Sequence, residues 1–433
     1  MNFAILLCNT LVELSIRDEL VEVSLCVPLG YNLDAIIGLN KAVNVIAFEH
    51  VPWNPTEFRF STFVGSIEPN LEDCGGMTYP KAVNGAMDIV IADVWILLTG
   101  IFGHGPIMPL KPYLVYAPDF IQRVVPEIYS SNPVDSHWLM NGWQSITMQN
   151  SRGVLVTSVQ TGRDAVSYAG VPSSKVHLLP MANAPLFSVD SGDLDRSRAK
   201  TEKLKRFFSG KISTSSIPYK VTESGMDQSP SSPLLQLLES KRPYFLWVTN
   251  TTRHKNQERA VEALERYYEE FDGRLACIMC GPTTELYLQP CGLPWVDKIH
   301  HKIKKSPALI ENLILAGTLS TERYKSLLSD AAFLWHNVLY DNGTFSVIEA
   351  ARLGTRSLVS VYPQMMEIVD HFRINAETFD PWDVEGAAIA LKGMEKKLIE
   401  QGAAATCNFD DDDAVVFKSK LSMLLEHSLT EVA

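Results

Sequence analysis

The stretch Tyr340-Asp341-Asn342-Gly343-Thr344-Phe345-Ser346-Val347-Ile348-Glu349-Ala350 follows an apolar run, Ala331-Ala332-Phe333-Leu334-Trp335, and opens a helix-like segment that ends near Gly354. The apolar run predicts a buried strand, so a glycine-bearing turn connects a strand to a helix. Such a turn offers free backbone N–H groups and the positive end of a helix dipole to an anion. Asp341 and Glu349 bracket the turn and can accept hydrogen bonds from sugar hydroxyls. Phosphate and polyol recognised side by side indicate a nucleotide sugar.

Length and composition describe an ordinary globular protein with a large core. The 433 residues leave room for two or three domains, and 46% of them are hydrophobic while 20% are charged. The net charge of −12 and the isoelectric point of about 5.4 argue against general nucleic-acid binding.

The cysteines and the apolar runs bear on where the protein works. The seven cysteines are an odd number spread over a long chain, which is typical of reduced thiols in a cytoplasmic protein. Cys277 and Cys280 share a strand-like run whose odd spacing puts them on opposite faces, so we expect buried structural cysteines rather than a metal or redox pair. No apolar run approaches the ~18 residues of a transmembrane helix. The initial run Asn2–Cys8 lacks a basic flank and is interpreted as a core segment rather than a signal peptide.

Apolar strand-like runs alternate with helix-like segments along the whole chain, which predicts an α/β protein with parallel sheets and crossover helices. In the first half the predicted strands are Val21–Val27, Val43–Phe48, Met87–Ala92, Tyr113–Ala117, Gly153–Ser158 and Val176–Leu179. In the second half they are Tyr244–Thr249, Leu275–Cys280, Leu313–Ala316, Phe333–His336 and Ser357–Val361, with helices at Asn256–Phe271, Ser320–Asp330 and Ser346–Leu353.

The two halves meet near a segment that cannot bury much apolar surface. Residues 209–233 are rich in Ser, Pro, Thr and Gly and are predicted to be an exposed insertion or connection. We therefore expect one domain over residues 1–234, including this insertion, and a second over residues 235–433. The second is expected to end in an amphipathic helix at Ala414–Leu425, whose start is marked by four aspartates, Asp410–Asp413.

A second candidate site follows the first strand of the second half. The loop Thr249–Asn256 carries Arg253 and Lys255 at the carboxyl end of a strand and just before a helix. Open α/β sheets bind ligands at that edge, and two cations there suit a diphosphate. Cations are mildly unfavourable at a helix N-terminus unless an anion is present, which favours binding over a merely solvated loop.

Together these motifs resemble the retaining glycosyltransferases of family 4, which have two Rossmann-like domains facing a cleft, the GT-B architecture. The resemblance runs from about Arg242 to Leu391, with weaker similarity from Tyr113 to Pro185. It comprises the Arg253 and Lys255 loop, the turn at Gly317, a helix with Tyr324, and an E-x₇-E element with Asp341 and Glu349 at its ends. The element continues as Ala351-Arg352-Leu353-Gly354, and Phe379-Asp380-Pro381 is similar to a further family motif.

The resemblance implies roles for individual residues. Glu349 would bind the ribose and Asp341 the transferred sugar. The diphosphate would be held by Arg253, Lys255 and the amides around Gly343 to Phe345. The donor-binding set is then Gly317, Asn342, Gly343, Thr344, Phe345 and Glu349, and the catalytic set is Asp119, Arg253, Lys255 and Asp341.

The sequence departs from the family at three places. Asp341 stands where the family has glutamate, which shortens the reach by one methylene. The family's first-half histidine, in an H-D-x₆-P-E setting, is replaced by Pro118 in Pro118–Glu127, which leaves Asp119 as a substitute contact and His50 and His104 as others. The family's glycine-rich loop after the first strand has no clear match, and Gly30 stands alone.

A basic run between Arg196 and Lys211 also contains Phe207 and Phe208. Cations beside aromatic residues suit an anionic membrane surface, although a solvated helix is the simpler interpretation. Peripheral contact with the inner face of a membrane would fit a lipid-linked acceptor.

The resemblance therefore implies a GT-B glycosyltransferase of polysaccharide biosynthesis, mannosyltransferase-like in its donor domain. The second half would bind the nucleotide sugar, and the first half a glycan or lipid-linked acceptor, with no metal or other cofactor. Three alternatives stay open: a nucleotide-sugar epimerase, a phosphorylase of similar architecture, and a catalytically silent binding subunit.

Overall fold

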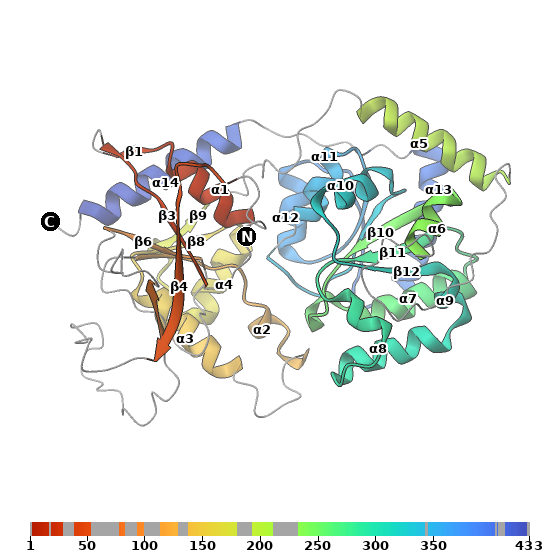
Figure 1. Ribbon diagram of the computed structural model, residues 1–433, viewed down its shortest axis with the longest axis horizontal. Helices are drawn as coiled ribbons and strands as arrows, with labels where there is room; N and C mark the ends of the chain where they lie inside the picture. Colours follow the sequence, from red (N-terminus) through yellow and green to blue (C-terminus); the bar gives the residue numbers. More distant parts are fainter. Residues whose placement is uncertain are drawn as a thin grey trace. The chain divides into compact units, whose positions relative to one another are not determined.

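The structure, a computed structural model, describes residues 2–16, 19–28, 39–52, 78–82, 93–98, 113–128, 137–179, 193–210, 233–342, 345–402, 405 and 412–430. The chain forms two compact units. The first comprises Met1–Leu186 and Asp410–Ala433, and the second comprises Phe187–Phe409. Both are built of helices and mainly parallel sheets, so the predicted α/β fold with two Rossmann-like domains is confirmed (Figure 1).

The first unit contains a four-stranded parallel sheet in the order β6-β7-β8-β9, with β6 at Trp95–Leu97, β7 at Tyr113–Tyr116, β8 at Gly153–Val156 and β9 at Val176–Leu178. A separate sheet pairs β3 (Ser24–Pro28) in parallel with β4 (Asn44–Pro52), and β4 in antiparallel with β5 (Thr78–Ala82). A short antiparallel pair joins β1 (Ser15–Ile16) to β2 (Glu19–Leu20). The helices are α1 (Asn2–Leu11), α2 (Ile121–Val124), α3 (His137–Asn150), α4 (Val159–Ala169) and α14 (Asp412–Thr430).

Most predicted strands of this half are found near their expected positions. The antiparallel β5 was not expected from a pattern that predicted parallel sheets. The expected strand Met87–Ala92 lies outside the described residues. The initial run forms α1, whose Leu7 and Cys8 are buried, so its interpretation as a core segment is confirmed.

The second unit is a six-stranded parallel sheet in the order β12-β11-β10-β13-β14-β15. Its strands are β10 (Tyr244–Val248), β11 (Ala276–Cys280), β12 (Leu313–Gly317), β13 (Leu334–His336), β14 (Ser357–Ser360) and β15 (Glu377–Phe379). Its helices are α5 (Asp193–Phe208), α6 (Pro233–Glu239), α7 (Gln257–Glu269), α8 (Pro294–Lys305), α9 (Pro307–Asn312), α10 (Thr321–Asp330), α11 (Phe345–Arg352), α12 (Pro363–His371) and α13 (Val384–Gln401). This strand order is that of the doubly wound dinucleotide-binding fold.

Both faces of this sheet are covered. On one face the aromatic strand residues Phe245, Trp247, Phe333 and Trp335 pack with α7, α8 and α13 in a single core. Helices α10, α11 and α12 group on the other side (Figure 1). Cys277 and Cys280 are buried in β11, as expected for structural cysteines.

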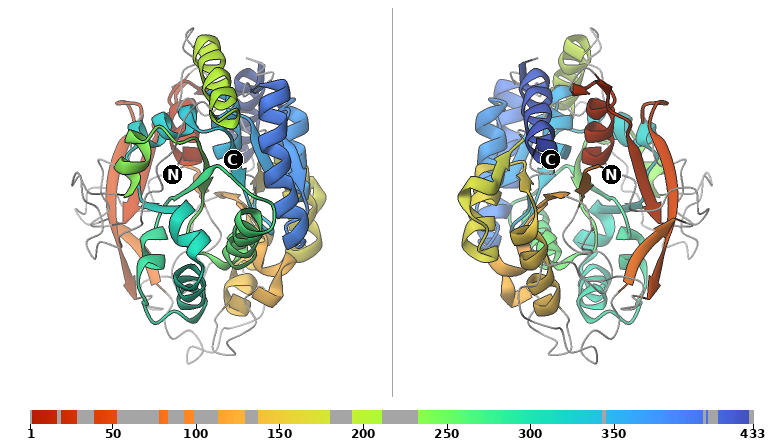
Figure 2. Two further views of the ribbon diagram at one scale, coloured as in Figure 1. Left: turned by 90° about the vertical axis from the view of Figure 1, so that its right-hand side faces the viewer. Right: turned by 90° about the vertical axis from the view of Figure 1, so that its left-hand side faces the viewer.

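The units divide the chain differently from the boundary expected near Leu235. Helix α5 precedes that boundary, yet its Leu204 and Phe207 belong to the core of the second unit, where α5 packs on α13. Helix α14 was expected in the second domain, yet its Phe417 and Leu421 share a core with Leu7 of α1 in the first unit (Figure 2). In both cases the apolar side of an amphipathic helix, α5 or α14, packs against a helix that is distant in sequence.

Candidate functional site

The strand order of the second unit reverses between β10 and β13. From β10 the chain moves outward through β11 to β12 and then returns to the other side of β10 as β13. Loops that leave the two central strands therefore diverge at their carboxyl ends, and this is where open α/β sheets bind ligands. The loop after β10 carries Arg253 and Lys255, and the loop after β13 carries Asp341 and Asn342. The topology thus brings both candidate motifs to one point.

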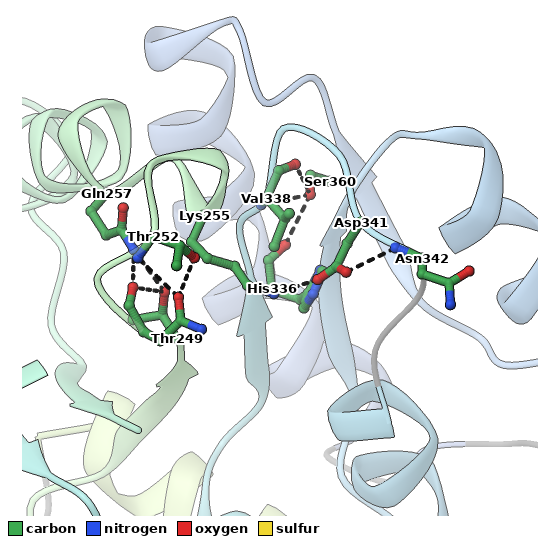
Figure 3. A network of polar contacts seen from close by, with 10 residues as sticks. Thr249, Thr252, Lys255, Gln257, His336, Val338, Asp341, Asn342 and Ser360 are labelled. Carbon is green, nitrogen blue, oxygen red and sulfur yellow. Dashed lines mark hydrogen bonds and ion pairs between the residues drawn. The ribbon is translucent and has the colours of Figure 1, made fainter. Parts of the chain in front are cut away.

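Lys255 and Asp341 contact each other across this point. The Lys255 Nζ atom donates a hydrogen bond to Asp341 Oδ2, and the two side chains are only 16% and 15% exposed (Figure 3). The other carboxylate oxygen, Oδ1, accepts the backbone N–H of Asn342 at 2.8 Å. The Asp341 carboxylate therefore holds the Lys255 side chain against the edge of the sheet.

Hydrogen bonds of buried amide groups fix the loop after β10 and the loop after β13 relative to each other. Asn256 donates from Nδ2 to Asn337 Oδ1 at 3.0 Å and to the Pro381 carbonyl at 2.7 Å. The backbone N–H of Leu339 donates to the His254 carbonyl at 2.9 Å. Asn256 takes a left-handed conformation, φ 58°, which turns the chain sharply from the Arg253–Lys255 turn into α7. Lys255 is thus presented from a loop with little freedom.

Further hydrogen bonds brace the ends of the strands (Figure 3). Gln257 Nε2 donates to Thr249 Oγ1 at 3.1 Å, and the Val338 N–H donates to Ser360 Oγ at 3.0 Å. Both acceptors lie at the carboxyl ends of strands in the same sheet, β10 and β14. The loops that carry the candidate side chains are therefore tied to the rigid part of the unit.

Two buried histidines lie close to the Lys255–Asp341 pair. Burial, with the nearby charge of Lys255, lowers the pKa of His254 to about 4 and that of His336 to about 3. Neither ring nitrogen of His336 has a hydrogen-bond partner among the described residues. For Asp341 burial is the largest single influence and would raise the pKa, but the charge and hydrogen bond of Lys255, together with His254 and His336, outweigh it, so the net pKa is lowered. At neutral pH Asp341 is therefore an anion, and the imidazoles of His254 and His336 are neutral.

Glu349 lies in the second turn of α11 and is held by a tyrosine from another helix. The hydroxyl of Tyr324, on α10, donates to Glu349 Oε2 at 2.7 Å. Burial raises the pKa of Glu349, and the Tyr324 hydrogen bond partly offsets this effect. A buried carboxylate with one oxygen occupied by a fixed donor is a well-oriented acceptor for a hydroxyl group.

Glycines shape the edge beside Tyr324. Gly317 ends β12 with φ 65°, and its carbonyl accepts the N–H of Gly281 at 2.9 Å. Gly281 has φ 130°, and a Cβ atom there would lie 1.9 Å from the Thr249 carbonyl oxygen, so no side chain fits. These glycines let the ends of β10, β11 and β12 approach one another closely.

The other predicted donor-binding residues are only partly described. Phe345 begins α11 and Asn342 is buried, whereas Gly343 and Thr344 lie outside the described residues. Their predicted contacts with a diphosphate stay predictions.

Asp119, the predicted catalytic contact in the first half, belongs to the first unit. Its Oδ1 accepts the N–H of Ile121 at 3.2 Å at the start of α2, and its carbonyl accepts from Gln144 Nε2. These contacts give it a structural task, and its catalytic role stays a prediction. Gly30 and His104 lie outside the described residues, and His50 lies in β4.

The predicted membrane-binding run forms most of α5. Phe207 is buried, and the Arg274 guanidinium lies 4.8 Å from the centre of its ring and 5.4 Å from that of Phe208. Lys200 donates to Thr355 Oγ1. The aromatic side of this helix thus faces its own unit, which leaves less of the run available for a membrane surface.

The described ranges contain no group of three or more His, Cys, Asp or Glu side chains placed to hold a metal ion. Within the same ranges, no helix has both the length and the apolar character needed to cross a bilayer.

Sequence reasoning missed the neighbours that surround the predicted residues. His254 and His336 were not singled out, and Tyr324 was noted only as part of a motif. The signal for His336 was available, because a histidine ends an otherwise apolar strand next to the decisive stretch. The Tyr324–Glu349 contact spans 25 residues and two helices, so spacing alone could not reveal it.

Part of the second unit matches the model of a known protein family. Residues 236–401 match the model of the family described as glycosyl transferases group 1, which is less than half of the chain. No curated protein matches the sequence. The match supports the predicted resemblance to glycosyltransferases for the part that holds the candidate site.

Several solved structures are similar over about three quarters of the chain. Anabaena HepE in complex with UDP-glucose is 13% identical, with 74% of this chain and 72% of that chain covered and a TM-score of 0.43. The α,α-trehalose 6-phosphate synthase from Burkholderia multivorans is 10% identical, with 75% and 68% covered and a TM-score of 0.45. A mutant of TarM from S. aureus is 11% identical, with 74% and 50% covered and a TM-score of 0.40.

Proposed function

We propose that this protein is a glycosyltransferase that transfers a sugar, with retention of configuration, from a nucleotide-diphosphate sugar to a glycan or lipid-linked acceptor. The observation that carries the proposal is the contact between Lys255 and Asp341 at the reversal point of the second sheet, with Arg253 in the same loop as Lys255 and Glu349 in the helix that follows Asp341. The match of residues 236–401 to glycosyl transferases group 1 supports the same class of reaction.

Each residue has a chemical task in this proposal. Glu349, with one oxygen held by Tyr324, accepts hydrogen bonds from the ribose hydroxyls. Lys255 and Arg253 bind the diphosphate, where they stabilise the negative charge that grows as the sugar–phosphate bond breaks. Asp341 accepts hydrogen bonds from hydroxyls of the transferred sugar. The first unit supplies the acceptor side, with Asp119 as a candidate contact.

The contact between Lys255 and Asp341 also suggests an order of events. While they are paired, each neutralises the other. An arriving diphosphate carries more charge than one carboxylate and competes for Lys255. Asp341 is then released toward the sugar, so the two halves of the donor are recognised together. Retention would follow from attack on the front face of the sugar, assisted by the leaving diphosphate.

A second candidate is a catalytically silent binding subunit. It is favoured by Pro118, which stands where similar glycosyltransferases carry a histidine near the reacting sugar. Such a subunit would keep the donor site described above and lack turnover.

A thermal-shift screen over nucleotide sugars tests the proposal, because a ligand at 100 times its Kd stabilises a protein by roughly 2.7 kcal/mol. The release of nucleotide diphosphate from each donor that binds, with and without glycan acceptors, then measures turnover. Stabilisation with turnover supports a transferase, and stabilisation without turnover supports the silent subunit. No stabilisation by any nucleotide sugar would overturn both.

A further inference from the structure

Glu285 places a buried carboxylate oxygen, which has no hydrogen-bond partner among the described residues, at the edge of the second sheet. It lies in the short turn Thr284–Leu288 that follows β11 and contacts β12. Its Oε2 atom is buried and has no hydrogen-bond partner among the described residues, and it lies 3.6 Å from where a Cβ atom of Gly317 would stand. A carboxylate is an acceptor with no donors of its own, and leaving it unsatisfied beside the backbone is costly.

Glu285 lies at the same edge of the sheet as the proposed donor site, next to the ends of β11 and β12. Cys280 at the end of β11 pairs with Gly317 at the end of β12 after a shift in register, and the N–H of Gly281 donates to the Gly317 carbonyl. Tyr324 lies on α10, the helix that follows β12. A nucleotide with its diphosphate at β10 and β13 and its ribose at Glu349 and Tyr324 therefore extends its base toward β11 and β12.

We propose that Glu285 reads the base of the donor nucleotide and selects guanine. This inference rests on the proposed function and deepens it by naming the nucleotide. Guanine presents two adjacent donors on its pairing edge, N1–H and the N2 amino group, and these match the two oxygens of one carboxylate. The terminal torsion of a glutamate side chain is soft, so a small rotation turns both oxygens toward the base.

The same carboxylate rejects the other common base of sugar donors. Uracil has a single donor, N3–H, flanked by two carbonyl oxygens that repel a carboxylate. Glycine at position 317 contributes to the same selection, because its φ of 65° and missing side chain leave the base room to approach the backbone. A purine is larger than a pyrimidine and needs that room.

Titration of GDP, inosine diphosphate and UDP into the whole protein tests the inference. Inosine diphosphate differs from GDP only by lacking the N2 amino group, so the pair isolates one of the two hydrogen bonds. We expect GDP to bind about 10- to 100-fold more tightly than UDP, with inosine diphosphate between them, since hydrogen bonds to charged groups carry effects of this size.

Glu285→Gln is the matched variant, because it keeps the shape and replaces one acceptor oxygen with a donor. It should weaken GDP binding about 10-fold or more and leave UDP binding unchanged or improved, since an amide can pair with uracil. Glu311→Gln, which removes an exposed carboxylate from α9, is the control for loss of one charge and should bind all three ligands like the wild type.

The outcomes separate the two proposals. If UDP binds as tightly as GDP, or if Glu285→Gln weakens both equally, the guanine inference is overturned while the donor site stands. If none of the three diphosphates binds the wild type, the proposed donor site itself is overturned.

Discussion

At the scale of single residues, Lys255 and Asp341 are paired at the point where a diphosphate and a sugar are proposed to bind. Their side chains are mostly buried, so solvent does not screen the pair as it screens a surface salt bridge. Removing one partner leaves an unpaired charge near the sheet edge. Effects of substitutions at Lys255 and Asp341 on stability can therefore be distinguished from their effects on turnover by comparing single and double variants.

Lys255→Ala should lower turnover by at least about 100-fold, because it removes a cation from the leaving diphosphate. It should also cost about 1–3 kcal/mol of unfolding free energy by leaving Asp341 unpaired. Adding Asp341→Asn to this variant should restore most of the stability and none of the turnover. Urea unfolding and donor turnover of the wild type, the two single variants and the double variant measure this cycle. Equal stability of Lys255→Ala and wild type would show that the pair does not form in solution.

Glu349→Gln should weaken binding of the nucleotide diphosphate by about 10- to 100-fold, since a charged acceptor for ribose hydroxyls is lost. Tyr324→Phe should act in the same direction with a smaller effect, because Glu349 loses the donor that orients it. Calorimetric titration checks both. A 2′-deoxyribose diphosphate should be less sensitive to Glu349→Gln than the ribose form, and equal sensitivity would contradict contact with the 2′-hydroxyl.

At the scale of helices and strands, the sequence predicted the second unit better than the first. Its strands are continuous apolar runs because both faces of the sheet are covered, and such runs stand out clearly. The antiparallel pairing of β4 with β5 was missed because it depends on the partner strand and not on local periodicity. The short strand β15, Glu377–Phe379, was missed because two of its three residues, Glu377 and Thr378, are polar, so it lacks the apolar run that marks the other strands.

The candidate site shows the same division. The stretches that contain Arg253, Lys255, Asp341 and Glu349 were found, because each follows a strand and precedes or opens a helix. The contact between Lys255 and Asp341 follows from strand order, which no single segment encodes. The buried histidines His254 and His336 needed the packed structure, because their character is set by burial.

Acid should destabilise the second unit through its buried histidines. His336 has a pKa of about 3 in the folded chain and His254 about 4, against an ordinary value of 6.5. Between these values the unfolded chain binds more protons, so stability is lost as the pH falls below 6.5. At pH 5 each of these two buried histidines lowers the free energy of unfolding by about 2 kcal/mol relative to neutral pH. His336→Phe should therefore flatten the dependence of thermal unfolding on pH between 7.5 and 5, and an unchanged slope would contradict a neutral His336.

At the scale of the whole molecule, the chain forms two units with separate cores, and the first is completed by the last described helix. Phe417 and Leu421 of α14 pack with Leu7 of α1, although the two helices lie at opposite ends of the sequence. The proposed nucleotide site lies entirely on the second unit. Damage to the first core should therefore leave donor binding intact.

Leu421→Ala tests this separation. The side chain is fully buried, so its truncation should cost about 2–5 kcal/mol through lost burial and a residual cavity. Differential scanning calorimetry should show the first unit melting earlier, while nucleotide diphosphate binding well below that transition stays at the wild-type affinity. Met423→Ala, at an exposed position of the same helix, is the control and should change neither quantity. Loss of nucleotide binding in Leu421→Ala at a temperature where it is folded would show that the units depend on each other.

The most direct test of the central claim is the affinity of a sugar-bearing donor relative to its bare nucleotide diphosphate, measured by calorimetry for wild type and Asp341→Ala. The bare diphosphate lacks the group that Asp341 is proposed to hold, and the variant also releases Lys255 for the phosphates. We predict that the wild type binds at least one nucleotide-diphosphate sugar. We also predict that Asp341→Ala weakens that donor by about 10-fold or more relative to the diphosphate. An unchanged ratio of the two affinities, or a wild type that binds no nucleotide sugar, would contradict the account.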